Sequence, residues 1–556
     1  MKRAQVILIL AFIAIMAFEG NFVDNDVWFL LSDGRYVASF GIPHVEPFTL
    51  HEGFHFLMQQ WLFALGLWQI YCMGGVYGLV FFSWAAGAAL LLLYYRLQMR
   101  VTGGNESVSS LFTAVVMFFA CWLYITQRPQ VVSALIFLIE IYLLERQRAR
   151  MARTLPLAFF VLSALLINLH AAMWPLLLVF LLPYLLESLV GERFRWCRQE
   201  FRWPLRQWLL LIAVSLLAGL CNPYGTEAMI YTAHSYGSAE INAIVGEMLP
   251  LSLKYVATGL PLLLILISAG FYTRKALPLR YQLLALGTGA MALQANRSFF
   301  LFLLFGTLGI GYLFRDWQEQ QRSSTWPQVR RWGLLLFCLA TGMDLMIFFK
   351  MRETASVVRQ EAFFLLAVVS LLFVLLCAVQ LFRRRAQAAA LASGNLRLTT
   401  AILAFFLLPL FALKWQPPQM VSPALARSAD ILLAEEQPSA LRLYTGYDEG
   451  GYMEFRGIPS YLDTRAEVFL PALNWQEDVL KEYLDFIYGR LDYREFQQRN
   501  HFTHLLTTDD DPLYTYLAAD PDYVLLYDSA EDDSLSKVQQ QEKKRIRLYA
   551  YRPAAQ

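Results

Sequence analysis

DNDVWFLLSDGRYVASFG, residues 24–41, follows directly on an apolar segment of the kind that crosses a membrane. The stretch carries two carboxylates two residues apart, Asp24 and Asp26, then an aromatic pair, and then Gly34 and Arg35. Ionisable side chains at the edge of a bilayer are costly, and they are therefore candidates for function. What they do depends on which side of the membrane receives them and on which other polar groups lie there.

The composition of the 556-residue chain is that of a polytopic membrane protein. Hydrophobic residues make up 57% and charged residues only 16%, whereas about a quarter of the residues of a soluble protein are charged. The net charge of +2 gives no reason to expect a nucleic-acid partner. The six cysteines show no CxxC or Cys/His spacing, so neither a zinc site nor a disulfide framework is expected.

Apolar runs of membrane-spanning length recur along the chain and predict an α-helical protein with about 13 transmembrane helices. The expected spans cover residues 5–19, 75–97, 108–126, 130–146, 155–169, 173–189, 207–221, 256–273, 281–294, 298–314, 332–349, 361–382 and 398–414. Residues 54–71 are also apolar and aromatic, but the run breaks at Gly74 and Gly75. We expect an interfacial or re-entrant helix there, because the charge distribution fits only if this segment does not cross.

Positively charged side chains determine the expected orientation. With the N-terminus in the cytoplasm, most Lys and Arg residues of the first 414 positions fall on the cytoplasmic side, among them RQRARMAR (146–153) and RRR (383–385). This is the distribution that the positive-inside rule requires. The first external loop, residues 20–74, then lies on the outer face and carries Asp24 and Asp26 with it.

The chain is expected to divide into a transmembrane domain, residues 1–414, and a soluble extracytoplasmic domain, residues 415–556. The second part alternates strand and helix patterns, which is typical of a small α/β fold. The predicted strands are RLYTGY, SYLDTR, HFTHLLTT, YVLLYD and RIRLYAYR. In the second of them, Asp463 and Arg465 form either an exposed site or an internal ion pair that holds the strand to the turn at Gly450.

Further polar motifs fall on the same outer face, although they are scattered along the chain. They are QRPQ (127–130), NLH (168–170), NPYG (222–225) and ANR (295–297). The candidate binding residues, from these motifs and from the external loops, are Arg297, Arg128, His170, Asn168, Asn222, Tyr224, Arg35, His55, Gln59 and Glu247. Their shared side indicates that they converge on one site near Asp24 and Asp26.

Each of these residues also has a purely structural explanation. Asp24 or Asp26 suits the N-cap of the following helix, and Asn222 before a proline suits a helix end. Arg128 and Arg297 suit contacts with lipid headgroups, and a single interfacial histidine is more often a hydrogen-bonded structural group than a catalyst. These separate explanations do not explain why all the motifs fall on the same side of the membrane.

The order of the motifs resembles that of the GT-C superfamily of integral membrane glycosyltransferases, which includes protein O-mannosyltransferases and lipid A aminoarabinose transferases. The first loop carries Asp-x-Trp-aromatic at residues 26–29 and Gly-Arg at residues 34–35. Arg-Pro-Gln, Asn-Leu-His, Asn-Pro-Tyr-Gly and a late arginine follow in that order. The resemblance covers nearly the whole chain.

The resemblance implies a GT-C-like fold in a bacterial inner membrane. It also implies transfer of a sugar from a polyprenyl-phosphate carrier, held among membrane lipids, to an envelope glycan, lipid or protein on the outer face. Asp26, or as second choice Asp24, would take the proton of the acceptor hydroxyl. Arg297, Arg128 and His170 would stabilise the leaving phosphate. As an alternative, the two acids would together grip a divalent cation, Mg or Mn.

Two other classes of function stay open on the sequence alone: a transporter for a lipid-linked glycan, and a non-catalytic scaffold that binds an envelope partner. A transporter predicts repeat symmetry between two halves and polar groups at mid-membrane, whereas here the polar groups gather on one side and no repeat is recognisable. The sequence has neither GxGxxG nor a Walker A motif, so nucleotide sugars and ATP are not expected as direct substrates.

Overall fold

The computed structural model describes residues 12, 23–190, 193, 197–235, 241, 245–252, 256–272, 277–320, 421–532 and 544–553. Of the expected spans, those at residues 332–349, 361–382 and 398–414 lie outside the described residues, and so does the span at 5–19 apart from Phe12. Every other expected span coincides with a helix.

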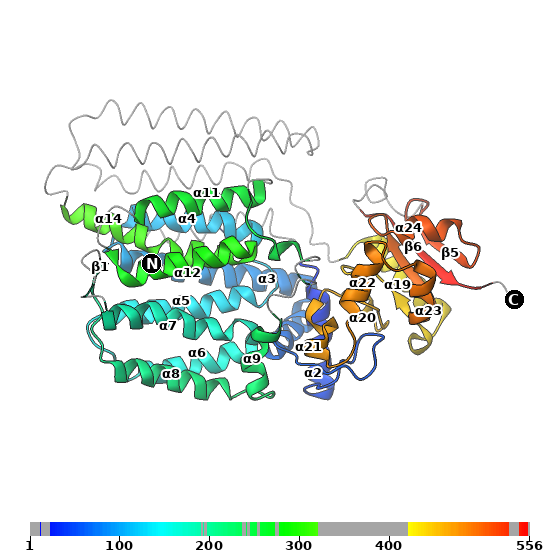
Figure 1. Cartoon of the computed structure of the whole chain (residues 1–556), viewed down its shortest axis with the longest axis horizontal. Coiled ribbons are helices and arrows are strands. Elements are labelled where there is room, and N and C mark those ends of the chain that lie inside the picture. Colours follow the sequence, from blue (N-terminus) through cyan, green and yellow to red (C-terminus); the bar gives the residue numbers. More distant parts are fainter. Residues whose placement is uncertain are drawn as a thin grey trace, which may run out of the picture.

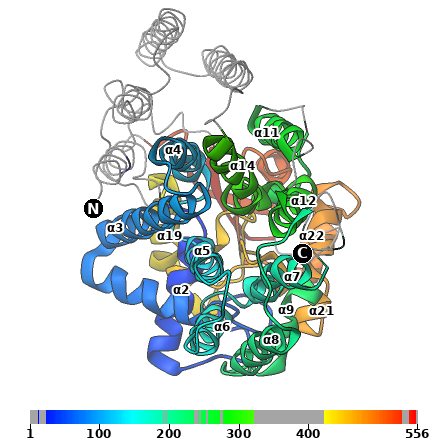
Figure 2. The same cartoon turned by 90° about the vertical axis from the view of Figure 1, so that its left-hand side faces the viewer.

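A bundle of apolar helices forms the larger part of the molecule (Figure 1), and Figure 2 views these helices end-on. They are α3 (Trp61–Val101), α4 (Glu106–Leu123), α5 (Gln130–Arg146), α6 (Leu155–Leu169), α7 (Trp174–Val190), α8 (Leu205–Gly219), α11 (Val256–Tyr272), α12 (Leu279–Gln294) and α14 (Leu308–Gln320). Three stretches of the described chain are long and apolar enough to cross a membrane by themselves: Trp61–Val101, Ala171–Val190 and Asn296–Leu313. The protein is therefore a multi-pass membrane protein.

Short elements join the helices at both ends of the bundle. They are η1 (Ala171–Met173), η3 (Gly246–Met248), η4 (Asn296–Ser298), and the paired parallel strands β1 (Cys197–Arg198) and β2 (Leu277–Pro278). After η4, α13 (Phe299–Leu301) and the π-helical η5 (Phe302–Gly306) lead into α14 and form with it the apolar stretch Asn296–Leu313. Near β2, the buried Arg280 donates to Glu145 at 2.7 Å and to Glu187 at 2.8 Å. These ion pairs hold α5, α7 and α12 together at the end of the bundle remote from residues 24–41.

The expected break at Gly75 is confirmed, although the helix around it begins later than predicted. Gly75 has φ 55° and ψ −144° inside α3, a conformation that glycine adopts far more easily than other residues. A Cβ atom on Gly78 would lie only 2.7 Å from the carbonyl oxygen of Ile70, so the two halves of α3 meet closely at the kink. The helix begins at Trp61 rather than at residue 54, because the preceding segment makes loop contacts instead.

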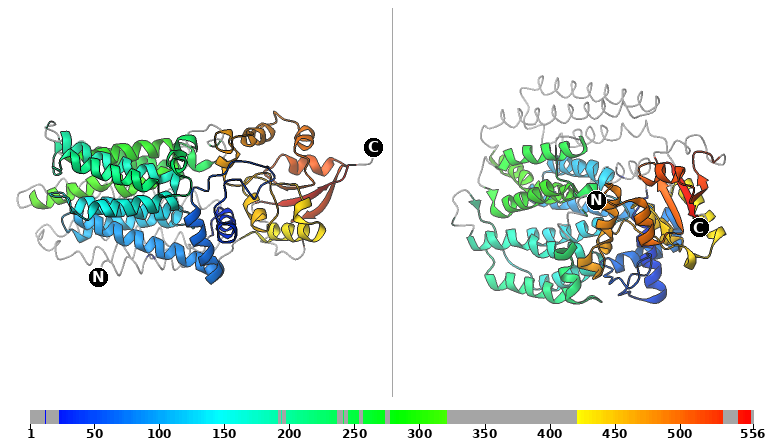
Figure 3. Two further views of the ribbon diagram at one scale, coloured as in Figure 1. Left: turned by 90° about the horizontal axis from the view of Figure 1, so that it is seen from below. Right: turned by 45° about the vertical axis from the view of Figure 1, so that its right-hand side comes forward.

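The described part of residues 421–553 packs at the end of the bundle that carries α2 (Val27–Phe40) and α9 (Thr226–Ser235), as Figures 1 and 3 show. Its elements are α19 (Pro423–Glu435), η7 (Pro438–Ala440), β3 (Leu443–Tyr444), α20 (Gly450–Phe455), η8 (Ala466–Phe469), α21 (Pro471–Asn474), α22 (Val479–Ile487), α23 (Tyr493–Asn500), β4 (His504–Thr508), α24 (Leu513–Tyr516), η9 (Leu517–Ala519), β5 (Tyr523–Asp528) and β6 (Ile546–Tyr551). The sheet order is β3-β4-β6-β5. β3 and β4 are parallel and the other pairs antiparallel.

Four of the five predicted strands are found, and the prediction of a strand at SYLDTR is wrong. Only Ser460 of that segment makes strand-like bridges, to Thr49 and to Leu443. The chain then leaves the sheet because the charged side chains of Asp463 and Arg465 turn inward and pair with each other. Of the two readings of this pair, the internal ion pair is confirmed.

Arg465 joins the C-terminal part of the chain to the first loop. Its side chain is 4% exposed and carries a single positive charge among four buried carboxylates. Two of these come from the first loop, Asp33 at 3.7 Å and Glu46 at 3.0 Å, and two from nearby in sequence, Glu454 at 3.0 Å and Asp463. Because α2 carries Asp33, this cluster fixes α2 against α20.

Burial changes the proton occupancy of this cluster, which we call the Arg465 cluster. Loss of hydration raises the pKa of Asp33 to about 8, although the charge of Arg465 opposes the rise. Burial likewise raises the pKa of Glu454 well above its usual value. Asp33 is therefore largely protonated at neutral pH, and burial shifts Glu454 in the same direction, so the cluster holds less negative charge than its composition suggests.

Removal of the arginine is expected to destabilise the fold strongly. Arg465→Met leaves the remaining buried carboxylates without a counter-charge, which costs about 3–5 kcal/mol. Thermal unfolding of the purified protein in detergent measures this loss. Arg490→Met is the matched control, because Arg490 pairs with Asp485 while 69% exposed. Equal unfolding temperatures for the two variants would contradict the role given to the cluster.

Candidate functional site

Asp24 and Asp26 stand at the start of α2, but the Asp26 side chain is not used to cap it. The Asp24 carboxylate accepts a hydrogen bond from the backbone N–H of Asp26 at 3.0 Å, and the helix begins through backbone bonds, such as that from Val27 N–H to the Asp24 carbonyl. The Asp26 carboxylate is directed to the guanidinium of Arg128, at 3.1 Å. The N-cap explanation therefore does not account for the Asp26 carboxylate.

Arg128 gathers three acids from distant parts of the sequence. Its guanidinium lies 2.9 Å from Asp24, 3.1 Å from Asp26 and 3.3 Å from Glu247 of η3. The neighbouring Gln127 holds this turn in place, because its side chain accepts from Asp24 N–H at 3.0 Å and donates to Ser83 of α3 at 2.9 Å. The predicted convergence of these four charged residues is thus observed.

The pKa of Asp26 is raised to about 7. Burial is the main cause, and the negative charges of Asp24 and Glu247 add to it, while Arg128 and the hydroxyl of Thr464 act in the opposite direction. A carboxyl group that titrates near neutrality is suited to general acid–base chemistry.

The geometry does not favour a divalent cation between the two aspartates. The guanidinium of Arg128 already lies against both carboxylates, and a cation placed there would be repelled by it. Within the described ranges, no group of three or more His, Cys, Asp or Glu side chains is placed to hold a metal ion.

Residues of the C-terminal part complete the surroundings of Asp26, and these were missed from the sequence. Thr464, next to the anchored Arg465, places its hydroxyl beside the Asp26 carboxyl. Tyr447 donates to the Thr464 carbonyl at 2.8 Å, and its own pKa is raised by burial and by nearby carboxylates that include Asp26. The only sequence signal was the Asp-x-Arg pair on either side of Thr464.

Gln59 links the first loop to the site from another direction. Its carbonyl accepts from Ala171 N–H at 2.9 Å, beside His170. Its side chain donates to Glu467 at 3.2 Å, and Glu467 also accepts from the Tyr231 hydroxyl of α9 at 3.1 Å. Glu467 of η8 in the C-terminal part is therefore bound from both the first loop and α9.

His170 and Arg297 come together at the same end of the bundle. His170 is buried, with its Nδ1 atom 2.8 Å from the Ser133 hydroxyl, and Arg297 is the charged group that acts on it most strongly. Asn296, next to Arg297, donates from its backbone to the carbonyl of Leu249 at 3.0 Å. This bond ties η4 to the segment that carries Glu247.

The remaining candidates use their polar atoms to hold the loops. Asn222 donates to the carbonyls of Gly219 and Gly225 within its own turn. The Tyr224 hydroxyl donates to the carbonyl of Pro43 at 2.9 Å, and Arg35 donates to that of Phe455 at 2.9 Å. Their placement on the shared end is as expected, and their contacts are structural.

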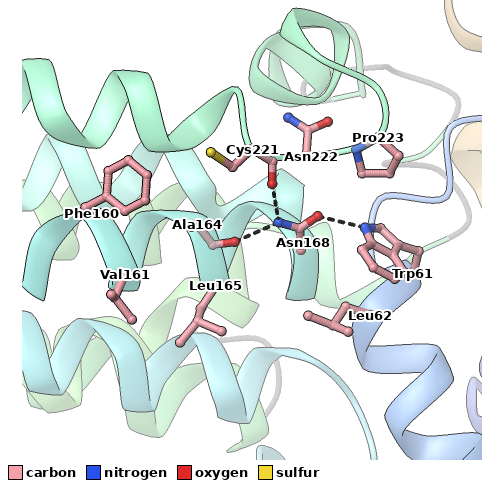
Figure 4. Close-up of a pocket in the computed structure, with 10 residues that line it drawn as sticks. All are labelled: Trp61, Leu62, Phe160, Val161, Ala164, Leu165, Asn168, Cys221, Asn222 and Pro223. Carbon is pink, nitrogen blue, oxygen red and sulfur yellow. Dashed lines mark hydrogen bonds between the residues drawn. The ribbon is translucent and has the colours of Figure 1, made fainter. Parts of the chain in front are cut away.

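A shallow apolar groove of about 460 Å³ opens beside this end of the bundle (Figure 4). It is lined by Trp61, Leu62, Phe160, Val161, Ala164, Leu165, Asn168, Cys221, Asn222 and Pro223. Asn168 closes its polar end, accepting from Trp61 Nε1 at 2.9 Å and donating to the carbonyls of Ala164 and Cys221. These bonds satisfy the amide, so the groove offers an apolar wall.

Solved structures with the same fold are membrane proteins of the GT-C class. ArnT from Cupriavidus metallidurans in the apo state has a TM-score of 0.56 and 12% identity, over 98% of this chain and 96% of its own. ArnT bound to undecaprenyl phosphate has a TM-score of 0.54 and 13% identity over the same shares. An Archaeoglobus fulgidus oligosaccharyltransferase in the apo form has a TM-score of 0.52 and 9% identity, over 91% of this chain and 69% of its own.

The expected GT-C fold is thereby confirmed for this chain. No protein-family model matches the sequence, and no functionally curated protein matches it either. At these identities the likeness establishes the fold, and the chemistry has to be argued from the site.

Replacing Arg128 is expected to move the titration of Asp26. In Arg128→Met, the positive charge that lowers the pKa of Asp26 is gone, so the carboxyl should titrate clearly above the value of about 7 in the unmodified protein. Infrared titration of the protonated carboxyl band, with Asp26→Asn to identify the signal, measures the change. Arg456→Met, which removes an arginine paired with Asp430, should leave the Asp26 band in place. An unshifted band in Arg128→Met would overturn the assignment.

Proposed function

We propose that this protein transfers a sugar from a polyprenyl-phosphate carrier to an envelope glycan, lipid or protein at the outer face of a bacterial inner membrane. The observation that carries the proposal is the neutral-range carboxyl of Asp26 beside Arg128, at the end of a GT-C bundle that also holds His170 and Arg297. With about 13 spans and a cytoplasmic N-terminus, this end and residues 415–556 face outward.

Asp26 acts as the general base. In its ionised form it takes the proton of the acceptor hydroxyl while that oxygen bonds to the anomeric carbon of the sugar. The bond between the anomeric carbon and the phosphate oxygen breaks, and the phosphate leaves with the electron pair as polyprenyl phosphate. A pKa near 7 leaves a substantial ionised fraction at neutral pH and gives the base useful proton affinity.

Arg297 and His170 serve the leaving phosphate. Arg128 is surrounded by Asp24, Asp26 and Glu247. These acids neutralise its positive charge, and their negative charges would repel a phosphate. Arg297 is the charged group that acts most strongly on His170, and we assign both side chains to the phosphate. Charge-assisted hydrogen bonds from an arginine are the usual means of binding a phosphate.

The apolar wall near Asn168 suits the lipid part of such a substrate. ArnT, which shares the fold, has been solved with undecaprenyl phosphate bound. A lipid phosphate keeps its tail in the bilayer while its headgroup reaches the membrane surface, and residues at the end of the bundle meet it there. This supports a polyprenyl carrier over a water-soluble donor.

Loss of the Asp26 carboxylate is expected to slow transfer strongly. Asp26→Asn should slow it by about 10²–10⁴-fold, the usual contribution of a general base. In the unmodified protein, the rate should rise with pH through about 7 as Asp26 loses its proton. Consumption of polyprenyl-phosphate sugars in proteoliposomes, followed by mass spectrometry of the lipid extract, measures both effects.

Asp430→Asn is the control for this experiment, since Asp430 lies on α19, is half-exposed and pairs with Arg456. It should retain full transfer. If Asp26→Asn also transferred normally, the base assignment would fail. If the unmodified protein transferred no sugar at all, a scaffold that binds through residues 415–556 would become the better account.

Arg297→Gln is expected to weaken binding of the carrier lipid. Loss of a charge-assisted hydrogen bond of about 1.5–3 kcal/mol corresponds to roughly 10- to 100-fold in affinity. Native mass spectrometry with undecaprenyl phosphate measures this directly. Arg100→Gln is the control, because Arg100 lies at the other end of α3 and donates to the carbonyls of Glu145 and Arg146 of α5. Unchanged affinity in Arg297→Gln would remove Arg297 from the phosphate site.

A further inference from the structure

Trp475 is an exposed aromatic side chain held in a strained backbone conformation. It follows α21 with φ 62° and is 68% exposed. A non-glycine residue in this left-handed region is uncommon, and such outliers concentrate at functional sites. Its neighbour Asn474 holds the turn with three side-chain hydrogen bonds: Nδ2 donates to the carbonyls of Val468 and Glu477, and Oδ1 accepts from Gln476 N–H.

The first loop presents His55 to one face of the Trp475 ring. The two rings are stacked, with centroids 3.6 Å apart and planes inclined by only 5°. The backbone N–H of His55 donates to the Asn474 carbonyl at 3.0 Å, and Gln476 donates to the Gly53 carbonyl at 2.6 Å. The orientation of Trp475 is thus fixed from two segments more than 400 residues apart in sequence, leaving the other face of the ring to solvent.

Glu227 adds a polar group beside this aromatic pair. His55 Nε2 is hydrogen-bonded to Glu227 Oε1, and the Glu227 side chain is 39% exposed, so a carboxylate oxygen is available to a ligand. A pyranose sugar has C–H groups on the faces of its ring and hydroxyl groups at its edge. The Trp475 ring face suits the C–H groups, and the Glu227 carboxylate suits the hydroxyl groups.

The surface formed by Trp475, His55 and Glu227 is connected to the candidate site through α9. Glu227 and Tyr231 are four residues apart on α9 and therefore share one face of the helix. Tyr231 and Gln59 both donate to the Glu467 carboxylate. The backbone carbonyl of Gln59 accepts from the N–H of Ala171, the residue after His170. One helical turn therefore separates Glu227 from Tyr231, and the hydrogen bonds of Tyr231, Glu467 and Gln59 connect this helix to the backbone beside His170.

We propose that Trp475, His55 and Glu227 form a subsite that binds a pyranose ring of the acceptor; this rests on the proposed transferase function. A tryptophan that served only to anchor the protein in lipid headgroups would need no fixed partner and no adjacent carboxylate, which anionic headgroups would repel. The substrate class is therefore an acceptor that already carries sugar, and the subsite holds that sugar outside the reaction centre.

Binding of simple glycosides to the full-length Asp26→Asn protein in nanodiscs tests the subsite without requiring turnover. The probes are methyl β-glucopyranoside, methyl β-galactopyranoside, methyl α-mannopyranoside and methyl N-acetyl-β-glucosaminide, followed by saturation-transfer NMR. At least one should show contacts through its ring C–H protons. Adding Trp475→Ala or Glu227→Gln should weaken that binding by about tenfold. Tyr488→Ala, at another exposed aromatic residue, should not.

Trp475→Gly serves as a second variant because glycine accepts the left-handed backbone; it should stay folded, as judged by thermal unfolding, and lose the glycoside. Absence of binding for all four glycosides, or equal binding with and without Trp475, would overturn the subsite. So would quenching by brominated lipids in the nanodisc that decreases when Trp475 is replaced by glycine, because that difference would identify Trp475 as a membrane anchor. Glycoside binding without any transfer by the unmodified protein would instead remove the proposed function and leave the subsite standing.

Discussion

The burial of Arg465 among carboxylates from two remote parts of the chain is the constraint on which the candidate site depends. Asp33 and Glu46 belong to the first loop, whereas Glu454 and Asp463 lie close to Arg465 in sequence. A buried charge that loses its partners is very costly, so the loop and the C-terminal part are held in one arrangement. Thr464 reaches Asp26 because its neighbour is anchored in this way.

The properties of Asp26 arise from a balance of opposing effects. Burial and two neighbouring acids favour its protonated form, and Arg128 and Thr464 favour its charged form. A fully paired carboxylate would be too weak a base to take a proton from a hydroxyl, whereas an unpaired buried one would rarely be ionised. The surrounding side chains keep Asp26 between these limits. The same carboxylates make Arg128 a poor partner for a lipid phosphate, and for this reason we propose Arg297 for that part.

Much of the architecture could be predicted because apolar periodicity and charge bias act locally. Helices α4, α5, α6, α7, α8, α11 and α12 fall where the hydropathy pattern places them, and the break at Gly75 follows from a residue that tolerates its backbone angles. The strand expected at residues 460–465 failed because ion pairing of Asp463 and Arg465 outweighs a local strand pattern. Helix α20 was missed because Gly450 and Gly451 are poor helix formers. Tertiary packing requires glycine here, because a Cβ atom on Gly450 would lie 1.8 Å from the Leu462 carbonyl oxygen.

The sequence by itself determined that the protein lies in a membrane, which end of its helices gathers polar motifs, and that Asp24, Asp26, Arg128 and Glu247 are candidates for one site. Hydropathy and charge are sums over neighbouring residues, so they can be read along the chain. Only the tertiary structure decided that Arg128 pairs with acids, that Thr464 and Tyr447 surround Asp26, and that Trp475 stacks on His55. These contacts join residues hundreds of positions apart, and no local pattern records which partners long-range packing will bring together.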